Sequence, residues 1–173
     1  DQTTDVLVVG TGFAGLTAAI EARLAGAEVL VIDKMPVHGG NSIINGGDFC
    51  AAGTAMQKAA GINDSPELML KDMLKAGNDL NHAELARLVA YQSAETLAWC
   101  QDFCGVQFTQ INFHGGHSVK RAHQTVNASG SELVNKFMKK ARELGVVVEQ
   151  RNKLVRVVSD DKGRVLGVEV RKG

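Results

Sequence analysis

Short apolar runs and helically spaced apolar residues follow one another at the start of the chain. Residues 6–9 (Val-Leu-Val-Val) and 29–32 (Val-Leu-Val-Ile) are uninterrupted apolar runs. Such runs are typical of parallel strands that are covered on both faces. Between them, residues 16–25 carry the mixed pattern of a helix, and Gly26 follows as its stop. The pattern therefore predicts a strand–helix–strand unit over residues 5–33.

A helical pattern covers residues 65–105. Ser65 and Pro66 form a helix start, with serine as N-cap and proline in the first turn, and the helix runs to Gly77. Asn81 and Glu84 indicate a second start with a capping box. The apolar positions that follow predict the buried face, and Ser93 leaves open a division into two helices; these positions are Leu85, Leu88, Val89, Leu97 and Cys100.

The remaining stretches complete an α/β pattern. Residues 50–62 indicate a short helix and a loop, and residues 106–128 a loop. Ser129 to Ser131 open a helix over residues 132–144, and Val146 to Val148 form a third parallel strand. Residues 154–158 and 165–170 flank a turn at 160–163 and predict a hairpin. The predicted fold is a Rossmann-like domain with a βαβ start, a helical insertion and a C-terminal β-hairpin.

Composition and charge narrow the classes of function. The 173 residues are 45% hydrophobic and 22% charged, with 19 basic and 19 acidic side chains. This balance gives no indication of a nucleic-acid partner, and no apolar run reaches the length of a membrane-spanning helix. Cys50, Cys100 and Cys104 form neither a disulfide framework nor a zinc ligand set, and we interpret them as buried free thiols. We expect no metal site.

The most informative motif lies between the first strand and the first helix. Gly10, Gly12 and Gly15 have G-x-G-x-x-G spacing, in which the glycines permit a tight turn, a close pyrophosphate and close helix packing. Asp33 ends the second strand eighteen residues after Gly15, where a carboxylate accepts hydrogen bonds from a ribose. The alternative is a plain βαβ unit with incidental glycines.

A second glycine-rich segment follows within residues 34–53. Gly39-Gly40-Asn41-Ser42 and Asn45-Gly46-Gly47 frame a short apolar stretch. A nicotinamide domain has no need of this segment, whereas a long flavin lying along backbone does, because glycines remove obstructing side chains. The alternative is a flexible surface loop.

Histidine and glycine also gather between residues 113 and 123. His114-Gly115-Gly116-His117 is followed by Arg121 and His123. Such groups suit the stabilisation of a carboxylate or a reduced flavin. A solvated surface loop is the alternative.

These motifs together resemble the flavoprotein family of fumarate reductase and succinate dehydrogenase. The likeness rests on the two glycine segments, Asp33, Asp64-Ser-Pro-Glu-Leu and Gly115-Gly-His-Ser-Val-Lys-Arg-Ala-His123. It is strongest to the soluble flavocytochrome c fumarate reductases, and covers only the N-terminal part of such a protein. The whole of residues 1–173 is then the beginning of an FAD-binding domain, with residues 129–173 supplying a helix, a strand and the hairpin.

The resemblance implies FAD as cofactor and assigns residues to it. The glycine turn holds the pyrophosphate, Asp33 the ribose, backbone at Leu154 the adenine, and the second glycine segment the flavin. The implied FAD-binding residues are Gly10, Gly12, Ala14, Gly15, Asp33, Lys34, Asn41, Ser42, Asn45, Gly46, Gly47 and Leu154. Membrane-bound relatives attach FAD to a histidine at a place corresponding to Gly40 and Asn41. His38 lies before that place, so we expect non-covalent FAD.

The resemblance also implies an activity. Family members continue past a hairpin like this one with the residues that bind and protonate substrate. We therefore expect an incomplete domain whose main catalytic residues lie beyond Gly173, with His117 and Arg121 in supporting roles. The implied reaction is reduction of the C=C bond of an unsaturated acid, fumarate by default, with an electron-donor protein or haem domain as partner. A dehydrogenase of steroid-like ketones and a non-catalytic FAD-binding module remain alternatives.

Overall fold

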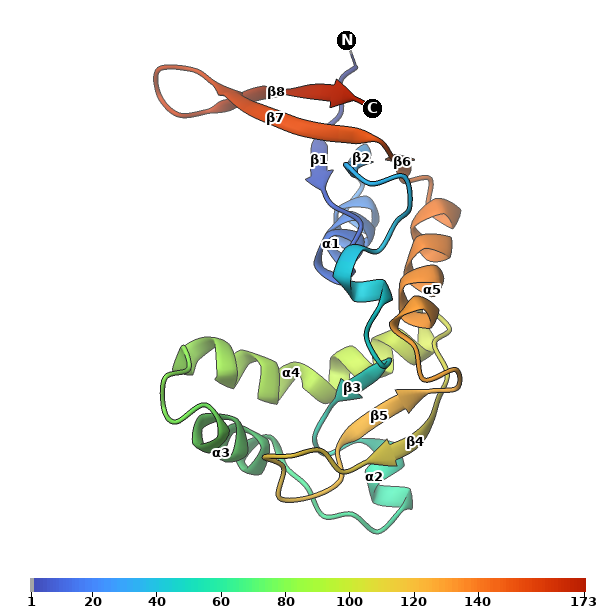
Figure 1. The fold of residues 1–173 in the computed structure, drawn as a ribbon, viewed down its shortest axis with the longest axis vertical. Coiled ribbons are helices and arrows are strands. Elements are labelled where there is room, and N and C mark those ends of the chain that lie inside the picture. The colour runs from blue at the N-terminus through green and yellow to red at the C-terminus, as the bar shows by residue number, and fades with distance from the viewer. Residues whose placement is uncertain (1) are drawn as a thin grey trace. The chain divides into compact units, whose positions relative to one another are not determined.

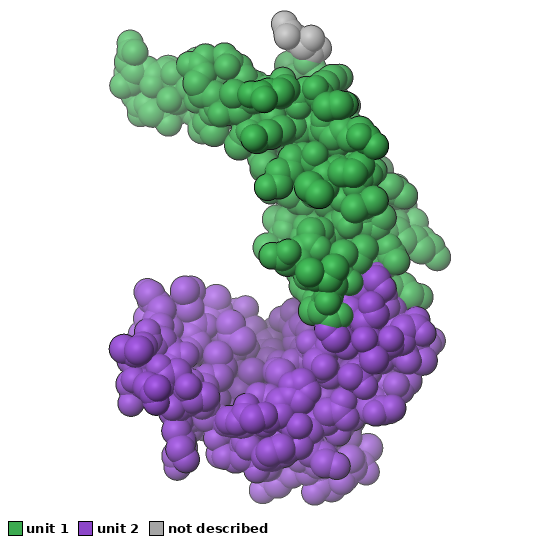
Figure 2. All heavy atoms as spheres, viewed as in Figure 1, with its two compact units in different colours: residues 1–45, 134–173 green, residues 46–133 purple. Residues whose placement is uncertain are grey.

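The computed structural model describes residues 2–173, which form two compact units (Figures 1 and 2). Unit 1 combines residues 2–45 with residues 134–173, and unit 2 comprises residues 46–133. The expected mixed α/β architecture is confirmed.

Unit 1 is built on a parallel sheet with strand order β1-β2-β6 (Figure 1). β1 (Val6–Val9) pairs with β2 (Val29–Ile32), and β2 pairs in turn with β6 (Val147–Glu149). The helix α1 (Phe13–Leu24) connects β1 to β2, and α5 (Gly130–Glu143) precedes β6. The predicted strand–helix–strand start and the third parallel strand are therefore confirmed.

The strands of this sheet are not equally buried. All four residues of the central strand β2 are buried, whereas β1 is half-buried and Val9 is 52% exposed. The expectation that β1 is covered on both faces is wrong for the described residues. β1 has only one neighbouring strand within residues 2–173, so its apolar run lacks the cover that β2 receives.

The buried apolar residues of unit 1 come mainly from β2 and from one face each of α1 and α5. Leu16, Ala19 and Ile20 of α1 are fully buried. The predicted apolar face of α5 is confirmed, since its members in unit 1, Val134, Phe137, Met138 and Ala141, are at most 4% exposed, and Leu133, the last residue of unit 2, is 4% exposed. The rings of Phe13 and Phe137 meet edge to face with centroids 6.0 Å apart. Burial of these faces, rather than helix propensity, stabilises both helices.

The C-terminal hairpin is also confirmed. β7 (Asn152–Ser159) pairs antiparallel with β8 (Val165–Lys172). Its turn is closed by the amide of Gly163, which donates to the carbonyl oxygen of Asp160 at 3.0 Å.

Unit 2 contains an antiparallel sheet that the sequence pattern did not predict. β3 (Asp48–Cys50), β5 (Ala122–Thr125) and β4 (Phe108–Asn112) lie in the order β3-β5-β4. The prediction of a loop over residues 106–128 is wrong at both strands. Polar residues such as Gln110, Asn112 and Gln124 interrupt the apolar pattern of both strands. In addition, β5 pairs with β3 across more than fifty residues of the chain, which a local pattern does not predict.

Three helices complete unit 2: α2 (Ala55–Ala59), α3 (Pro66–Ala76) and α4 (Ala83–Asp102). Ser65 caps α3 as predicted, since its side chain accepts a hydrogen bond from the amide of Leu68. The capping box predicted at Asn81 and Glu84 is wrong, because His82 is the N-cap of α4. No helix within residues 2–173 combines the length and apolar character needed to cross a bilayer.

The helix α4 differs from its prediction in continuity and in its buried face. It is one helix through Ser93, whose hydroxyl donates to the carbonyl oxygen of Ala90 at 2.8 Å. Leu85, Leu88 and Val89 are at least 50% exposed, so the predicted face is wrong in this half. The small residues Ala86 and Ala90 are buried there instead, and Ala90 packs with Ala52 and Met69. Close approach of backbones at alanine explains why the larger side chains point away.

Candidate cofactor-binding site

The glycine turn between β1 and α1 has the geometry that the fingerprint requires. Gly10 has a φ of 105°, in the left-handed region, and its amide donates to the carbonyl oxygen of Ile32 at 2.7 Å. A Cβ on Gly15 would clash with the carbonyl oxygen of Gly10 and lie 3.4 Å from Val8 Cγ1. A Cβ on Gly10 would instead enter open space. The turn therefore packs tightly on the protein side and is open on the other.

The N-terminus of α1 lies directly after this turn. Gly12 is the N-cap and has no side chain to satisfy the first amides of the helix. Ser42 supplies one partner, since its Oγ accepts a hydrogen bond from the amide of Phe13 at 3.1 Å. Ala14, in the first turn, is exposed. First-turn amides and the positive end of the helix dipole are a suitable site for a phosphate.

Asp33 is anchored to the glycine turn through Thr11. The Oδ2 atom of Asp33 accepts hydrogen bonds from the amide of Thr11 at 2.9 Å and from its hydroxyl, while Oδ1 accepts from the amide of Met35 at 2.9 Å. Burial alone would raise the pKa of Asp33, but the hydrogen bonds from Thr11 and Met35 outweigh it, aided by the charge of Lys34, and hold the pKa below its ordinary value. Asp33 is therefore a carboxylate at neutral pH.

Thr11 also contacts the second glycine segment, a role that the sequence pattern did not predict. Its hydroxyl oxygen accepts a hydrogen bond from the amide of Gly39 at 2.9 Å. One side chain thus joins the glycine turn, the end of β2 and the start of the second glycine segment. Thr11 has no exposed surface. The only sequence signal was a threonine at a variable position of the fingerprint.

The second glycine segment forms a short 3-10 helix rather than a flexible loop. Gly39 has a φ of 103° and precedes the helix η1 (Gly40–Ile43). The amide of Ser42 donates to the carbonyl oxygen of Gly39 at 2.9 Å, and Asn45 Nδ2 donates to the carbonyl oxygen of Ser42 at 2.7 Å. Asn41 is exposed. The ring of His38 is hydrogen-bonded to Asn135 at 2.9 Å.

Gly46 and Gly47 belong to unit 2. Gly47 has a φ of 73°, and a Cβ there would clash with Thr125 and Ser129. Its carbonyl oxygen accepts a hydrogen bond from the amide of Thr125 at 3.1 Å, which extends the pairing of β3 and β5. Glycine is required at this position by close backbone packing.

Two further predicted FAD-binding residues are Lys34, near the C-terminal end of β2, and Leu154, on the hairpin. Lys34 is exposed directly after Asp33. Leu154 is half-buried in β7 and pairs with Val170. The amide of Asn152, at the start of β7, donates to the carbonyl oxygen of Asp33 at 2.8 Å. The start of the hairpin is therefore anchored to the strand end that carries the carboxylate.

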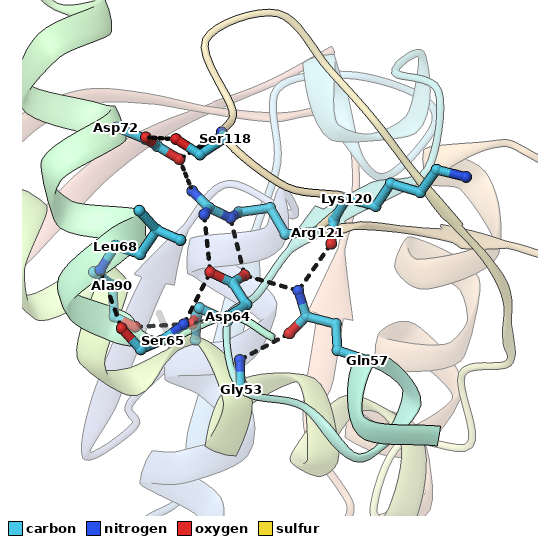
Figure 3. Close-up of polar contacts among 12 residues, drawn as sticks. Gly53, Gln57, Asp64, Ser65, Leu68, Asp72, Ala90, Ser118, Lys120 and Arg121 are labelled. Atoms are coloured by element: carbon cyan, nitrogen blue, oxygen red, sulfur yellow. Dashed lines mark hydrogen bonds and ion pairs between the residues drawn. The ribbon is translucent and has the colours of Figure 1, made fainter. Parts of the chain in front are cut away.

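Arg121 lies at the centre of a buried ionic network in unit 2 (Figure 3). Its Nε and Nη2 donate to the two carboxylate oxygens of Asp64 at 3.0 and 2.9 Å, and neither side chain is exposed. Its Nη1 lies 2.8 Å from Asp72 Oδ2. Asp72 accepts two further hydrogen bonds from Ser118, at 2.7 Å from the amide and 2.5 Å from the hydroxyl. The network links α3 to the loop 113–118.

Gln57 extends the network toward the sheet. Its Nε2 donates to Asp64 at 2.7 Å and to the carbonyl oxygen of Lys120 at 2.9 Å, and its Oε1 accepts from the amide of Gly53 at 2.8 Å (Figure 3). Asp64 and Asp72 cover two sides of the Arg121 guanidinium. The described contacts of the Arg121 guanidinium are therefore to Asp64 and Asp72, and its predicted supporting role stays a prediction. The one signal for this network in the sequence was Asp72, an aspartate on the buried face of α3.

His117 and His123 have different surroundings. His123 is fully buried; its Nδ1 donates to the carbonyl oxygen of Arg121 at 2.9 Å, and its Nε2 accepts from the hydroxyl of Thr54 at 2.9 Å. Burial lowers the pKa of His123, although its hydrogen bonds to the carbonyl oxygens of Arg121 and Phe49 act in the opposite direction. Burial, followed by the charges of Arg121 and His114, also lowers the pKa of His117. Both imidazoles are therefore neutral at neutral pH.

The described part of the chain holds no group of three or more histidine, cysteine or acidic side chains with a geometry for metal. By contrast, the residues of unit 1 fit a dinucleotide. The open side of Gly10, the exposed first turn of α1 and a carboxylate at the end of β2 lie around one turn. Backbone amides and a carboxylate are the groups that pyrophosphate and ribose require.

Comparison with known proteins identifies the cofactor. The family model described as "FAD binding domain" matches residues 5–173. The acrylate reductase flavoprotein subunit of Shewanella woodyi is 41% identical over 174 aligned residues, which include all of this chain and 34% of that protein. The chain thus spans about a third of the length of this relative.

Solved structures agree with this assignment. The open conformation of a flavocytochrome c3 fumarate reductase superimposes with a TM-score of 0.94 at 36% identity, over 98% of this chain and 30% of that one. A 3-ketosteroid-Δ4-(5α)-dehydrogenase from Rhodococcus jostii RHA1 gives a TM-score of 0.88 at 29% identity, over 99% of this chain and 42% of that one. The resemblance to flavocytochrome c fumarate reductases is confirmed, and the chain belongs to the FAD-binding domain family of flavin-dependent oxidoreductases.

Proposed function

We propose that this chain is the FAD-binding part of an oxidoreductase that reduces the C=C bond of an unsaturated carboxylic acid. The observation that carries the proposal is the 41% identity, over the whole chain, to a protein named as an acrylate reductase flavoprotein subunit. Bound FAD would supply a hydride to one carbon of the double bond, and a proton from the protein or solvent would complete the saturated acid.

The residues of this chain would bind and orient the cofactor. First-turn amides of α1, around Ala14 and Gly15, would donate to the pyrophosphate. Asp33 would accept the ribose hydroxyls, because each carboxylate oxygen can accept more than one hydrogen bond. Backbone at Leu154 would contact the adenine. The flavin would lie along the second glycine segment, near Asn41, Ser42, Asn45, Gly46 and Gly47.

The cofactor would be held without a covalent bond, and electrons would arrive from a donor protein or a haem domain. No histidine stands at Gly40 or Asn41, where membrane-bound relatives attach FAD. The structurally similar fumarate reductase is a flavocytochrome c3, and this likeness supports a haem partner for the present chain. The residues that protonate substrate would lie outside this chain.

A direct experiment tests the proposal on the longest natural form of the protein. Purified FAD-bound protein would be given acrylate or fumarate and reduced methyl viologen without oxygen. We expect viologen oxidation coupled to formation of propionate or succinate, identified by NMR. An FAD-bound protein that reduces no unsaturated carboxylic acid, these two and urocanate included, would contradict the proposal.

A second candidate function has a specific observation in its favour. The 29% identity and TM-score of 0.88 to a steroid dehydrogenase extend over nearly the whole chain. The same protein would then oxidise a 3-ketosteroid with an artificial electron acceptor and leave unsaturated acids unchanged. A non-catalytic FAD-binding module would do neither.

A further inference from the structure

A polar cluster formed by Asp48, His114 and His117 lies in unit 2. Asp48 begins β3, directly after Gly46-Gly47, and the two histidines lie in the loop after β4. His114 Nε2 is 3.7 Å from Asp48 Oδ2, and the rings of His114 and His117 stack with centroids 6.1 Å apart. His114 is 45% exposed and Asp48 19% exposed, so solvent or a ligand reaches the cluster.

Two polar atoms of this cluster are buried without a hydrogen-bond partner among the described residues. They are Oδ1 of Asp48 and Nδ1 of His117. Buried polar atoms in folded proteins almost always have a partner, and those without one need a specific explanation. His114, next to these two atoms, is partly exposed. A ligand that enters beside His114 would supply the missing hydrogen-bond partner of Asp48 Oδ1 or His117 Nδ1.

The loop that carries both histidines is held in place from behind. Ser118 donates twice to Asp72, and Asp72 is paired with Arg121 in the buried network (Figure 3). The amide of His117 donates to the carbonyl oxygen of His114 at 3.2 Å. A Cβ on Gly115 would meet nothing within 4 Å, so the space beside the loop is open. The cluster is therefore preorganised beside accessible space.

The charges around the cluster favour a ligand that donates hydrogen bonds. Arg121, the cation of the neighbouring buried network, already pairs with the carboxylates of Asp64 and Asp72. Asp48 adds a third carboxylate, which is acceptor-only. The pKa of His117 is lowered by burial and then by Arg121 and His114, so this ring adds no positive charge. A carboxylate ligand beside Asp48 would be repelled, whereas an N–H or O–H group would be attracted.

We propose that Asp48 is a specificity-determining residue that accepts a hydrogen bond from an N–H or O–H group at the far end of an unsaturated acid. This inference rests on the proposed function and narrows it: the preferred substrate is a donor-bearing monocarboxylic acid rather than a dicarboxylic acid. His114 and His117 complete the same subsite.

The test compares three acids that share the acrylic end. Acrylate has no second polar group, fumarate has a second carboxylate, and urocanate has an imidazole with an N–H donor. The ratio of kcat/KM for urocanate to that for acrylate is measured on FAD-bound full-length protein, because this ratio cancels losses of FAD or folded protein. The variants are Asp48→Asn and Asp48→Leu, with Asp161→Asn in the exposed hairpin turn as control.

We expect the wild-type protein to prefer urocanate over fumarate. Asp48→Asn should lower the urocanate-to-acrylate ratio about tenfold to a hundredfold, the range for a lost hydrogen bond to a charged group, and Asp48→Leu at least as much. An unchanged ratio in both variants, or a wild-type preference for fumarate, would overturn the inference while the proposed function stands.

Binding provides a readout that does not depend on turnover. Calorimetry would compare imidazolepropionate and succinate, the saturated counterparts, on wild-type protein and Asp48→Asn. Preferential binding of imidazolepropionate that is lost in the variant supports the inference. Equal binding of the two acids overturns it. Reduction of none of the three acids would reject the proposed function separately.

Discussion

Arg121 and Asp64 form a two-point ion pair in which neither side chain has exposed surface. Asp72 supplies a second carboxylate to the same guanidinium. Buried ion pairs add little when intact, because both charges have lost their hydration. Removing one partner is costly, because the other charge remains buried alone.

The first prediction follows from this pair. Arg121→Met should lower the free energy of unfolding by about 3–5 kcal/mol, since it leaves two buried carboxylates without their cation. Urea denaturation of the FAD-bound protein measures the change. Arg164→Met, in the exposed part of the hairpin, is the matched control and should remain close to wild type. Equal denaturation midpoints for both variants would show that the network contributes nothing.

Asp33 provides the second prediction. Asp33→Ala should weaken FAD binding by about 1–3 kcal/mol, the scale of lost hydrogen bonds to a charged group. Thr11→Val should weaken it less, because the carboxylate stays while one of its anchors is lost. Titration of apoprotein with FAD gives both affinities, and Asp161→Ala serves as an exposed control. Unchanged affinity in Asp33→Ala would remove this residue from the cofactor site.

Gly15 provides the third prediction. Gly15→Ala places a methyl group against the carbonyl oxygen of Gly10, so α1 must move away from β1. We expect a loss of about 1–3 kcal/mol in stability, as for other overpacked sites, together with reduced FAD occupancy. Thermal denaturation and the flavin-to-protein absorbance ratio report the two effects. Gly167→Ala has open space around it and should behave like wild type; a normal Gly15→Ala protein would refute the packing argument.

The fourth prediction concerns pH. Burial lowers the pKa of His123 in the folded protein below the value of about 6.5 in the unfolded chain. The unfolded state therefore binds the proton first, and stability is lost as pH falls through 6.5 toward the lower folded pKa. His117 acts in the same direction. The melting temperature should fall between about pH 7.5 and pH 5.5.

Replacement of His123 measures how much this residue contributes to the pH dependence of the melting temperature. His123→Gln should be less stable at neutral pH and should lose less stability on acidification than wild type. His38→Gln is the control, because His38 is hydrogen-bonded near the surface of α5. If the melting temperature of His123→Gln falls with pH as steeply as that of wild type, groups other than His123 cause the pH dependence.

The fifth prediction is that acid releases the flavin. Trichloroacetic acid precipitation of the full-length protein should leave the yellow chromophore in the supernatant, because no histidine stands at Gly40 or Asn41. Colour retained in the protein pellet would show a covalent link.

Local patterns in the sequence predicted unit 1 well, because its elements are specified by near neighbours. The apolar runs of β1 and β2, the glycine turn and the apolar face of α5 each depend on residues close in the chain. The sheet of unit 2 was missed because β3 pairs with β5 across a long separation and both strands carry polar residues. The buried face of α4 was missed because alanines rather than leucines face the neighbouring helix.

The candidate site residues stay a prediction, although the structure brings several of them together. The spacing rule for dinucleotide-binding glycines and a strand-end acid predicted Gly10, Gly12, Gly15 and Asp33, and the structure anchors Asp33 to the glycine turn. Thr11, Asp48 and Asp72 have no spacing rule, and only the folded arrangement shows what they contact. Arg121 was recognised as a candidate, but its burial between two aspartates was not visible in the sequence.

The hydroxyl of Thr11, shared between Asp33 and Gly39, has a consequence for how this sequence can diverge. A substitution at position 11 that removes the hydroxyl leaves a buried carboxylate short of a donor and the amide of Gly39 without its acceptor. Substitutions at positions 11 and 33 are therefore expected to occur together. Among descendants of this chain, threonine or serine at position 11 should be inherited together with aspartate at position 33, and the two should be replaced together.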